Sequence, residues 1–232
     1  MCLIGCFQSS EVRLLSNHNN INHIENSVVM LVAARDENML DDQVYETLGL
    51  DHDVFCAGFF IDQNTIITAN HCVVLERRYE PKIKYYKVIT YQMYHNDFHM
   101  RNYKLFQVIK QDKDADIAIL KLVSRQDDFY REHLCISYNE HFIGDQVITI
   151  GHPAGHKFIL TEGIISQDDV MLNHGRVIQA TTDIFHGNSG GPLINSSGCV
   201  IGVTSAFWAN RSHLGIFSSL RNERTDLEQY SN

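Results

Sequence analysis

A single serine in a glycine-rich stretch is the first group in the chain that could carry out chemistry. The stretch from Gly187 to Pro192 reads Gly-Asn-Ser-Gly-Gly-Pro, so three glycines and a proline surround Ser189. Glycine adopts backbone dihedrals that other residues avoid, and it lets a substrate approach the main chain closely. A tight turn here can direct the amides of Gly187 and Ser189 into one concavity. Such an arrangement suits an acyl-transfer nucleophile with backbone oxyanion donors. The alternative for the hexapeptide alone is a surface turn.

A histidine and an aspartate elsewhere in the chain could activate this serine. A serine hydroxyl is a weak nucleophile, which needs a base to remove its proton and a third group to orient that base. His71 follows an apolar run that begins at Ile66, and Asp116 directly precedes the apolar run 117–120. Both runs read as short buried strands. The candidate groups therefore occur in the order His, Asp, Ser.

The rest of the chain reads as about twelve short strands separated by glycine and asparagine turns, with almost no helical periodicity. One exception is a possible terminal helix over Glu223 to Gln229. This pattern predicts an all-β protein, a sandwich or a barrel. The predicted organisation is an N-terminal arm or poorly ordered tail (1–26), a first β unit (27–123), a connection (124–141), a second β unit (142–220) and a C-terminal segment (221–232).

Length, charge and hydropathy narrow the functional class. With 232 residues and 44% hydrophobic residues, the chain can bury a substantial core. The net charge of −9, without a basic stripe, argues against a nucleic-acid partner. The longest apolar runs are too short to span a membrane, which predicts a soluble protein without a membrane span. Residues 36–53 contain seven acidic residues and no Lys or Arg; we interpret them as a solvated loop in preference to a calcium site.

The cysteines and histidines indicate neither a metal nor a cofactor. Six cysteines in a chain of this length do not form a disulfide scaffold, and their spacing matches no metal motif. Two histidine pairs have members four residues apart, but neither contains the glutamate of a helical zinc-protease motif. These pairs are His95 with His99 and His152 with His156. A pairing of Cys135 with Cys2 or Cys6 is a weak prediction.

Four segments in the same order resemble the chymotrypsin/trypsin-fold serine peptidases, and within them the HtrA (Deg) and glutamyl-endopeptidase-like branch. The first combines Cys56-Ala57-Gly58-Phe59-Phe60-Ile61 with Thr68-Ala69-Asn70-His71-Cys72, the second is Asp116-Ile117-Ala118-Ile119-Leu120, the third combines Ile150-Gly151-His152-Pro153-Ala154-Gly155 with Gly163-Ile164-Ile165-Ser166, and the fourth combines residues 187–193 with Gly202-Val203-Thr204-Ser205. The resemblance covers about residues 27–220. It implies two six-stranded antiparallel β-barrels, with the active site in the cleft between them.

The resemblance also implies a role for each matching residue. Ser189 would attack the peptide carbonyl, His71 would act as general base and then acid, and Asp116 would orient His71. The amides of Gly187 and Ser189 would form the oxyanion hole. Cys56 and Cys72 occupy positions that are bridged in animal chymotrypsin-like enzymes, although two buried thiols remain the alternative.

Two departures from the family pattern affect the expected regulation. Trypsin-like zymogens have an aspartate before the nucleophile, which pairs with a newly cut N-terminal amine, whereas this chain has Asn188. We therefore expect activity without that activation step. HtrA proteins usually continue into a PDZ domain, and we expect none here because only about a dozen residues follow Ser219.

The resemblance places the pocket for the substrate side chain before the cleaved bond (P1) around a small set of residues. Asp183, six residues before Ser189, would favour Lys or Arg, so basic P1 is the first expectation and small or medium apolar P1 the second. Acidic P1 is the least favoured, because Asp183 would repel it and Thr204 replaces the histidine expected in enzymes of that specificity. The full candidate set is Asp183, Ile184, His186, Ser205, Ala206, Phe207 and Gly215.

The sequence therefore predicts a serine endopeptidase acting on polypeptides, as a dedicated processing or effector protease. A catalytically silent pseudo-peptidase that binds proteins is the main alternative, and a metal-binding or structural β protein is a further one. The first residues, Met1 to Cys6, resemble the end of a lipoprotein signal but lack a basic region and a sufficient apolar stretch. This pattern predicts a cytoplasmic protein or delivery without a signal, and secretion if the N-terminus is trimmed.

Overall fold

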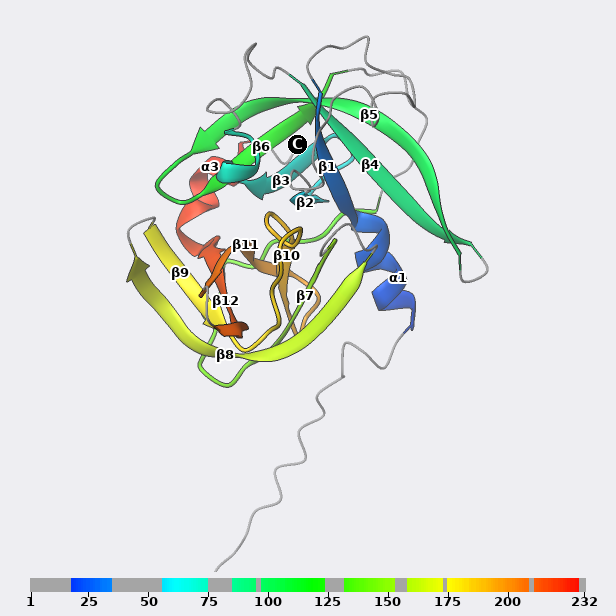
Figure 1. The fold of residues 1–232 in the computed structure, drawn as a ribbon. Helices are drawn as coiled ribbons and strands as arrows, with labels where there is room; N and C mark the ends of the chain where they lie inside the picture. The colour runs from blue at the N-terminus through cyan, green and yellow to red at the C-terminus, as the bar shows by residue number, and fades with distance from the viewer. Residues whose placement is uncertain are drawn as a thin grey trace, which may run out of the picture.

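The computed structural model describes residues 18–34, 56–74, 85–94, 97–123, 132–152, 158–172, 175–208 and 211–229. The protein is mostly β, as predicted, and its strands form two groups that lie one above the other (Figure 1). Residues 1–17 and the acidic region 36–53 lie outside the described residues. The expectations for these two regions therefore stay predictions.

The first six strands pair into a closed barrel in the order β1-β2-β3-β6-β5-β4. Their bounds are β1 Val28–Ala34, β2 Cys56–Phe60, β3 Thr65–Ala69, β4 Tyr85–Tyr94, β5 Asp97–Asp112 and β6 Ile117–Leu122. All neighbouring strands are antiparallel. Asp62 closes the turn between β2 and β3, because its carboxylate accepts hydrogen bonds from the Asn64 amide at 2.6 Å and the Thr65 hydroxyl at 2.7 Å.

The second six strands pair into a closed barrel in the order β10-β11-β12-β9-β8-β7. Their bounds are β7 Gln146–Gly151, β8 Ile159–Leu172, β9 Gly175–Ala180, β10 Pro192–Asn195, β11 Val200–Trp208 and β12 Arg211–Ser219. β8 is much longer than the strand Gly163 to Ser166 predicted from sequence. Its alternating exposed and half-buried residues explain the difference, since they leave only a weak apolar signal.

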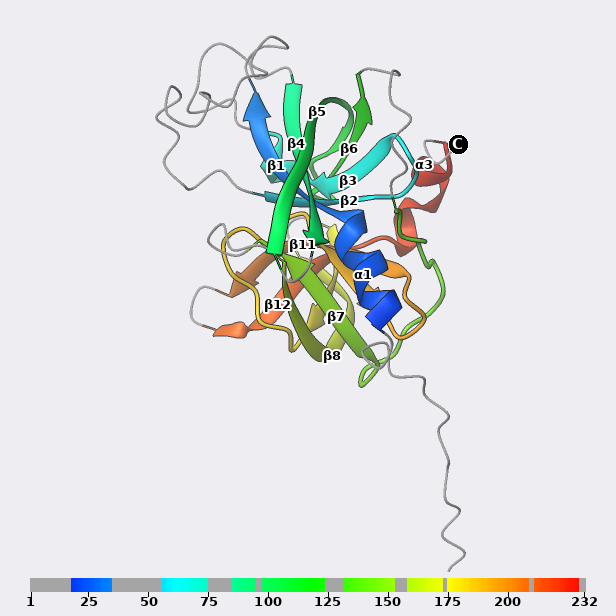
Figure 2. The ribbon, with the colours of Figure 1, turned by 90° about the vertical axis from the view of Figure 1, so that its right-hand side faces the viewer.

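Helices occupy two places at the surface of the barrels (Figure 2). Helix α1, His18–Ser27, includes all of the described part of the predicted N-terminal arm and buries Ile24. The described part of the predicted arm is therefore helical and buries Ile24, which its polar composition did not indicate. A short 3₁₀ turn, η5 (Arg221–Glu223), leads into α3, Arg224–Glu228, inside the predicted terminal helix. No helix in the described part of the chain is long and apolar enough to cross a membrane.

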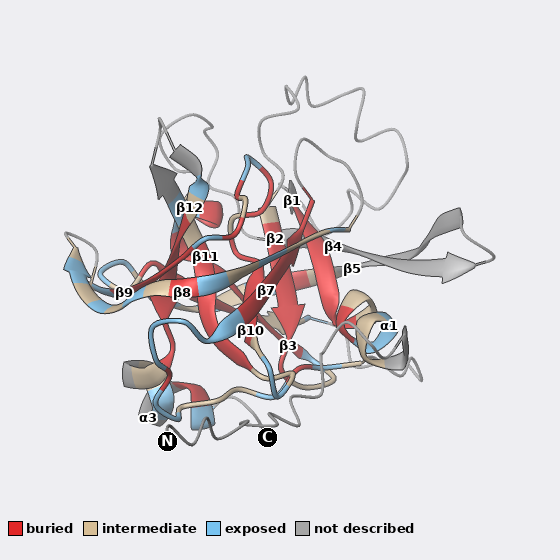
Figure 3. Ribbon diagram, turned by 90° about the horizontal axis from the view of Figure 1, so that it is seen from below, coloured by how far each residue is buried: buried red, intermediate tan, exposed pale blue. Residues whose placement is uncertain are grey.

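The buried core follows the strands of both barrels (Figure 3). One apolar cluster contains residues of both barrels, including Phe59 and Ile67 from the first and Ile148 and Val203 from the second. Apolar burial is the main favourable term in folding. The barrels are therefore packed against each other over a shared core, which holds the loops at their junction in a defined relation.

Two disulfides tie loops to this framework. Cys56 at the start of β2 is bonded to Cys72 after β3. Cys135 is bonded to Cys199, so the prediction that Cys135 pairs with Cys2 or Cys6 is wrong. The cause lies in tertiary structure: Ile136 forms a parallel bridge with Val200, which brings the connection between the barrels beside the start of β11.

Candidate active site

His71 lies in a short 3₁₀ turn, η3 (Asn70–Cys72), directly after β3. Three hydrogen bonds join this turn to Asp116. The Asn70 amide donates to the Asp116 carbonyl oxygen at 3.1 Å, and the His71 amide donates to Asp116 Oδ1 at 2.9 Å. His71 Nδ1 lies 2.8 Å from Asp116 Oδ2. The carboxylate therefore fixes both the backbone and the ring of His71, and it favours the tautomer whose Nδ1 carries the proton.

Asp116 is presented by the tight turn between β5 and β6. Asp112 Oδ1 accepts hydrogen bonds from the amides of Asp114 and Ala115, at 3.0 and 2.8 Å, and Asp116 itself adopts φ = +53°. A positive φ is unusual for a residue with a side chain, and such strain occurs often at functional sites. The conformation places the Asp116 carboxylate beside His71, where it is largely buried.

Ser205 supplies a further hydrogen bond to Asp116 from the second barrel. Thr204 pairs with Phe217 and Ala206 pairs with Ile216, so Ser205 is an extra residue in a bulge of β11. A bulge redirects a side chain out of the regular strand pattern. Here the Ser205 hydroxyl donates to Asp116 Oδ2 at 2.5 Å. The family resemblance places Ser205 in the substrate pocket, and the sequence gives no signal of its contact with Asp116 because that contact depends on the bulge.

These contacts determine the charge state of Asp116. Burial by itself raises the pKa of the carboxyl, but the hydrogen bonds and charge of His71, together with the bond from Ser205, lower the pKa below its ordinary value of 3.8. Asp116 is therefore ionised near neutral pH. An ionised carboxylate at Nδ1 also stabilises a positive charge that develops on the His71 ring.

The loop that carries Ser189 is held by both barrels. In the first barrel, the Ala57 amide donates to the Ser189 carbonyl oxygen at 2.7 Å. In the second barrel, the Gly190 amide donates to the Thr204 carbonyl oxygen at 2.7 Å. Gly190 has φ = +83°, and a Cβ placed on it would lie 2.2 Å from the Ala57 carbonyl oxygen. Only glycine fits at this position.

The backbone amides of this loop differ in whether they donate to a backbone carbonyl group. The amides of Asn188, Gly190 and Gly191 donate to backbone carbonyl groups. Within the described part of the chain, the amides of Gly187 and Ser189 donate to none. Gly187 has φ = +103°, a conformation that favours glycine. These are the two amides that sequence analysis assigns to an oxyanion hole.

The serine and histidine segments lie near each other, but their side chains are not bonded. Cys72 follows His71, and its sulfur lies 3.7 Å from the Ser189 carbonyl oxygen. No hydrogen bond joins the Ser189 hydroxyl to His71 among the described residues. The His71 side chain is 45% exposed, so the ring is open to solvent on one side.

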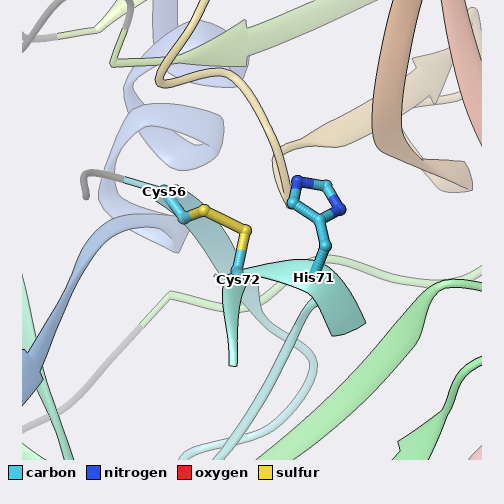
Figure 4. Close-up of side chains that lie close together, drawn as sticks. All are labelled: Cys56, His71 and Cys72. Atoms are coloured by element: carbon cyan, nitrogen blue, oxygen red, sulfur yellow. A yellow bond between two sulfur atoms is a disulfide. The ribbon is translucent and has the colours of Figure 1, made fainter. Parts of the chain in front are cut away.

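The structure also brings His71 close to the two cysteines of a disulfide (Figure 4). Ligand atoms of Cys56, His71 and Cys72 lie within 4.8 Å of one another, a spacing that could suit a metal. Both sulfurs are bonded to each other, however, and a disulfide offers no thiolate ligand. This cluster therefore positions the histidine turn and does not form a metal centre.

The predicted pocket residues are more dispersed than sequence suggested. The Asp183 side chain is 44% exposed and contacts His213, whose Nδ1 lies 2.6 Å from Asp183 Oδ1. Sequence analysis does not include His213 among the candidate residues, because its contact with Asp183 joins segments that are distant in the chain. Ile184 is buried in the core of the second barrel, whereas His186 and Ala206 are exposed. The side chain of Phe207 lies outside the described residues.

Gly215 and Ile184 are in direct contact at the predicted pocket. A Cβ placed on Gly215 would lie 2.7 Å from Ile184 Cγ1 and 2.7 Å from the Phe217 ring. The space beside this glycine is therefore already filled by side chains of the chain itself. A glycine at position 215 therefore permits the close approach of Ile184 and Phe217.

Comparison with solved structures identifies the fold. The model matches the crystal structure of Deg5 with a TM-score of 0.66 and 22% sequence identity, covering 89% of this chain and 90% of that one. It matches the active form of the Rv3671c protease from M. tuberculosis with a TM-score of 0.64 and 20% identity, covering 93% of this chain and 85% of that one. At these identities the likeness shows a trypsin-like fold.

Sequence comparison shows the family. Residues 56–203 match the model of the trypsin-like peptidase domain, which spans more than half of the chain, so the protein belongs to this family. Its relatives are of the HtrA/Deg type. The chain is 31% identical over 168 residues to the putative serine protease HhoA of Synechocystis sp., covering 68% of this chain and 38% of that protein. It is 36% identical over 105 residues to a probable periplasmic serine endoprotease, DegP-like, of Hahella chejuensis, covering 44% of this chain and 22% of that protein.

Proposed function

We propose that the protein is a serine endopeptidase that hydrolyses peptide bonds through an acyl-enzyme on Ser189. The observation that carries the proposal is the arrangement around Asp116. This carboxylate accepts hydrogen bonds from the ring and the backbone amide of His71 and from the Ser205 hydroxyl. Cys72, which follows His71, contacts the Ser189 loop, in which two amides have no backbone acceptor among the described residues. A dedicated processing or effector role is the biological form that we propose for this activity.

In the proposed reaction, His71 transfers protons, Ser189 forms the covalent bond, and the amides of Gly187 and Ser189 bind the oxyanion. His71 Nε2 takes the proton of the Ser189 hydroxyl as its oxygen bonds to the substrate carbonyl carbon, and the carbonyl oxygen becomes an oxyanion facing the amides of Gly187 and Ser189. His71 then donates this proton to the leaving amine as the peptide bond breaks. His71 then takes a proton from water as the water oxygen bonds to the acyl carbon. The bond from that carbon to the Ser189 oxygen breaks, the acid product leaves, and His71 returns the proton to the Ser189 oxygen.

We further propose that the enzyme needs no cleaved N-terminal amine for activity. Asn188 is buried, its amide donates to the Phe185 carbonyl oxygen at 3.1 Å, and its carbonyl accepts from Gly191 at 2.9 Å. A Cβ placed on Gly151 would lie 2.9 Å from Asn188 Oδ1, so this side chain is packed closely. A neutral, enclosed amide offers little attraction to an ammonium group.

For the substrate, we propose a small or medium apolar P1 residue in place of the basic residue favoured by sequence alone. Asp183 already contacts His213 at the surface, where water screens its charge. Ile184 fills the space against Gly215. A long cationic side chain would therefore find neither depth nor an unpaired buried carboxylate.

The silent pseudo-peptidase remains a second candidate, because no bond joins Ser189 to His71 among the described residues. Catalytic hydrogen bonds are often loose before substrate binds, so this geometry does not decide between the two functions. Reaction with a fluorophosphonate probe separates them. We expect a covalent adduct on Ser189 and cleavage of a peptide library, both absent from Ser189→Ala. The exposed Ser196→Ala is the matched control and should retain both; a wild-type protein without adduct or cleavage would favour the binding module.

A further inference from the structure

Thr68 is a fully buried polar residue in the strand that leads to His71, and the proposed reaction does not use it. It lies in β3, and its exposed fraction is 0%. β3 pairs with β2 at Phe59 and Phe60, and Ala57 lies beyond these two pairs. The Thr68 hydroxyl reaches that position and donates to the Ala57 carbonyl oxygen at 2.7 Å. A buried carbonyl group needs such a partner, because water does not supply one.

Ala57 connects Thr68 to the loop that carries the nucleophile. The Ala57 amide donates to the Ser189 carbonyl oxygen at 2.7 Å, while the Ala57 carbonyl oxygen accepts from Thr68. The Gly190 amide belongs to the same peptide unit as the Ser189 carbonyl group, and it donates to the Thr204 carbonyl oxygen at 2.7 Å. Both polar groups of that unit are thus bonded, one to each barrel. Because the unit is fixed, the direction of the Ser189 side chain is restricted.

Close packing at Gly190 strengthens this restriction. A Cβ placed on Gly190 would lie 2.2 Å from Thr68 Oγ1 and 2.2 Å from the Ala57 carbonyl oxygen. The backbone of the loop therefore lies directly against the hydrogen bond between these two residues. Thr68 and Ala57 are both fully buried, so the contact excludes water. A movement of the Ala57 carbonyl group or of the Thr68 side chain must therefore displace the residue that follows the nucleophile.

We propose that Thr68 is a positioning residue that sets the place of the Ser189 hydroxyl relative to His71. Thr68 and His71 belong to one continuous segment, β3 followed by η3, so the Thr68 hydroxyl relates the Ser189 peptide unit to the segment that carries the base. This inference rests on the proposed peptidase activity. Loss of the hydroxyl removes the donor to Ala57 and lets the loop shift. A small misplacement of a reacting group slows the chemical step without a matching loss of substrate binding.

The test makes the same substitution at two buried threonines of β3. Thr68→Val removes the hydroxyl and keeps the shape of the side chain. Thr65→Val is the matched control, because Thr65 is also fully buried but its hydroxyl donates to Asp62 at 2.7 Å, at the end of β3 away from His71. We would measure kcat, KM, melting temperature and the rate of reaction with a fluorophosphonate. For Thr68→Val we expect kcat and this rate to fall about tenfold to a hundredfold, with KM within about twofold. Thr65→Val should lower the melting temperature but leave kcat within about threefold.

Two smaller side chains show whether the hydroxyl or the packing is responsible. Thr68→Ser keeps the hydroxyl and loses the methyl group, whereas Thr68→Ala loses both. We expect Thr68→Ser to keep kcat within about threefold of the wild type and Thr68→Ala to be as slow as Thr68→Val. A serine variant as slow as the alanine variant would overturn the proposal, as would an unchanged kcat in Thr68→Val. The comparison of serine with alanine decides the question even if Thr68→Val does not fold.

The same experiment distinguishes failure of the inference from failure of the proposed function. Wild-type protein that neither cleaves peptides nor forms a Ser189 fluorophosphonate adduct would overturn the peptidase assignment, and the role of Thr68 with it. Active wild-type protein whose Thr68→Val variant loses kcat and melting temperature no differently from Thr65→Val would overturn the inference alone.

Discussion

The two barrels each contain an aspartate that contacts a histidine, and the two pairs differ in their surroundings. Asp116 and His71 are 2.8 Å apart, and Asp183 and His213 are 2.6 Å apart. The Asp116 side chain is 12% exposed and accepts three hydrogen bonds, whereas the Asp183 side chain is 44% exposed. Electrostatic interactions are stronger where water is excluded. A similar distance therefore leaves the two carboxylates in different environments, because Asp116 is largely buried and bonded by further donors whereas Asp183 is exposed.

The largest expected effect comes from neutralising Asp116, the buried aspartate of the two. By analogy with the Ser-His-Asp template, Asp116→Asn should lower kcat about 10⁴-fold, because the amide no longer holds the productive histidine tautomer. Steady-state kinetics on a cleaved peptide would measure this change, with circular dichroism as a check on folding. A loss smaller than about tenfold in a folded variant would remove Asp116 from the proposed triad.

A second prediction concerns acid stability and His152, which is fully buried directly after β7. Burial lowers the pKa of His152 from 6.5 to about 4, against a smaller opposing effect of the Val29 backbone. The unfolded chain therefore takes up a proton between pH 6.5 and pH 4 while the folded protein does not. This difference should cost about 3 kcal/mol of unfolding free energy as pH falls through that range. Urea unfolding at a series of pH values would measure it.

The pH range in which His152 changes the free energy of unfolding differs from that of Asp116. Asp116 has a lowered pKa, so its contribution to stability is present above the unfolded value near 3.8 and is lost only as pH falls further. His152→Asn should therefore flatten the stability curve between pH 6.5 and 4 and leave the steeper loss below pH 4. An unchanged slope between pH 6.5 and 4 in this variant would contradict the assignment to His152.

The third prediction tests the donor that distinguishes Asp116 from Asp183. Ser205→Ala removes a hydrogen bond to a charged acceptor, which is worth about 1.5–3 kcal/mol. We expect kcat to fall about tenfold to a hundredfold, since the carboxylate loses a constraint on its orientation. Ser205→Thr retains the hydroxyl and serves as the matched control. Equal kinetics for the alanine variant and the wild type would show that the Ser205 hydroxyl does not contribute to catalysis.

The smallest effect is expected at the exposed pair. An ion pair between exposed residues contributes less than about 1 kcal/mol and is screened by salt. Asp183→Asn and His213→Ala should therefore each change kcat/KM for a substrate with an apolar P1 residue by less than about threefold. A peptide library covering all P1 residues provides the measurement. If Asp183→Asn instead lost cleavage after Lys or Arg, the result would support the preference for a basic P1 residue that the sequence predicts.

Much of this protein could be predicted from its sequence because the relevant signals are local. Alternating apolar runs indicated the mostly β fold, and the glycines around Ser189 indicated a constrained loop, since φ of +83° at Gly190 excludes side chains. The strand that begins directly after Asp116 and the apolar run that leads to His71 could also be identified locally. The ordered helix α1 escaped prediction because its polar composition conceals the burial of Ile24.

The remaining features depend on contacts between distant segments, which no local pattern encodes. Cys135 meets Cys199 because Ile136 and Val200 form a bridge, and Ser205 meets Asp116 because a bulge turns its side chain out of β11. Asp183 lies at the surface beside His213. The sequence shows its charge but not its exposure, and the exposure weakens the interactions that this charge can make. Residue types and spacing thus determined which groups are available for chemistry. Only the tertiary structure decided which of these groups are buried, paired and oriented, because burial and hydrogen-bond geometry arise when the two barrels pack together.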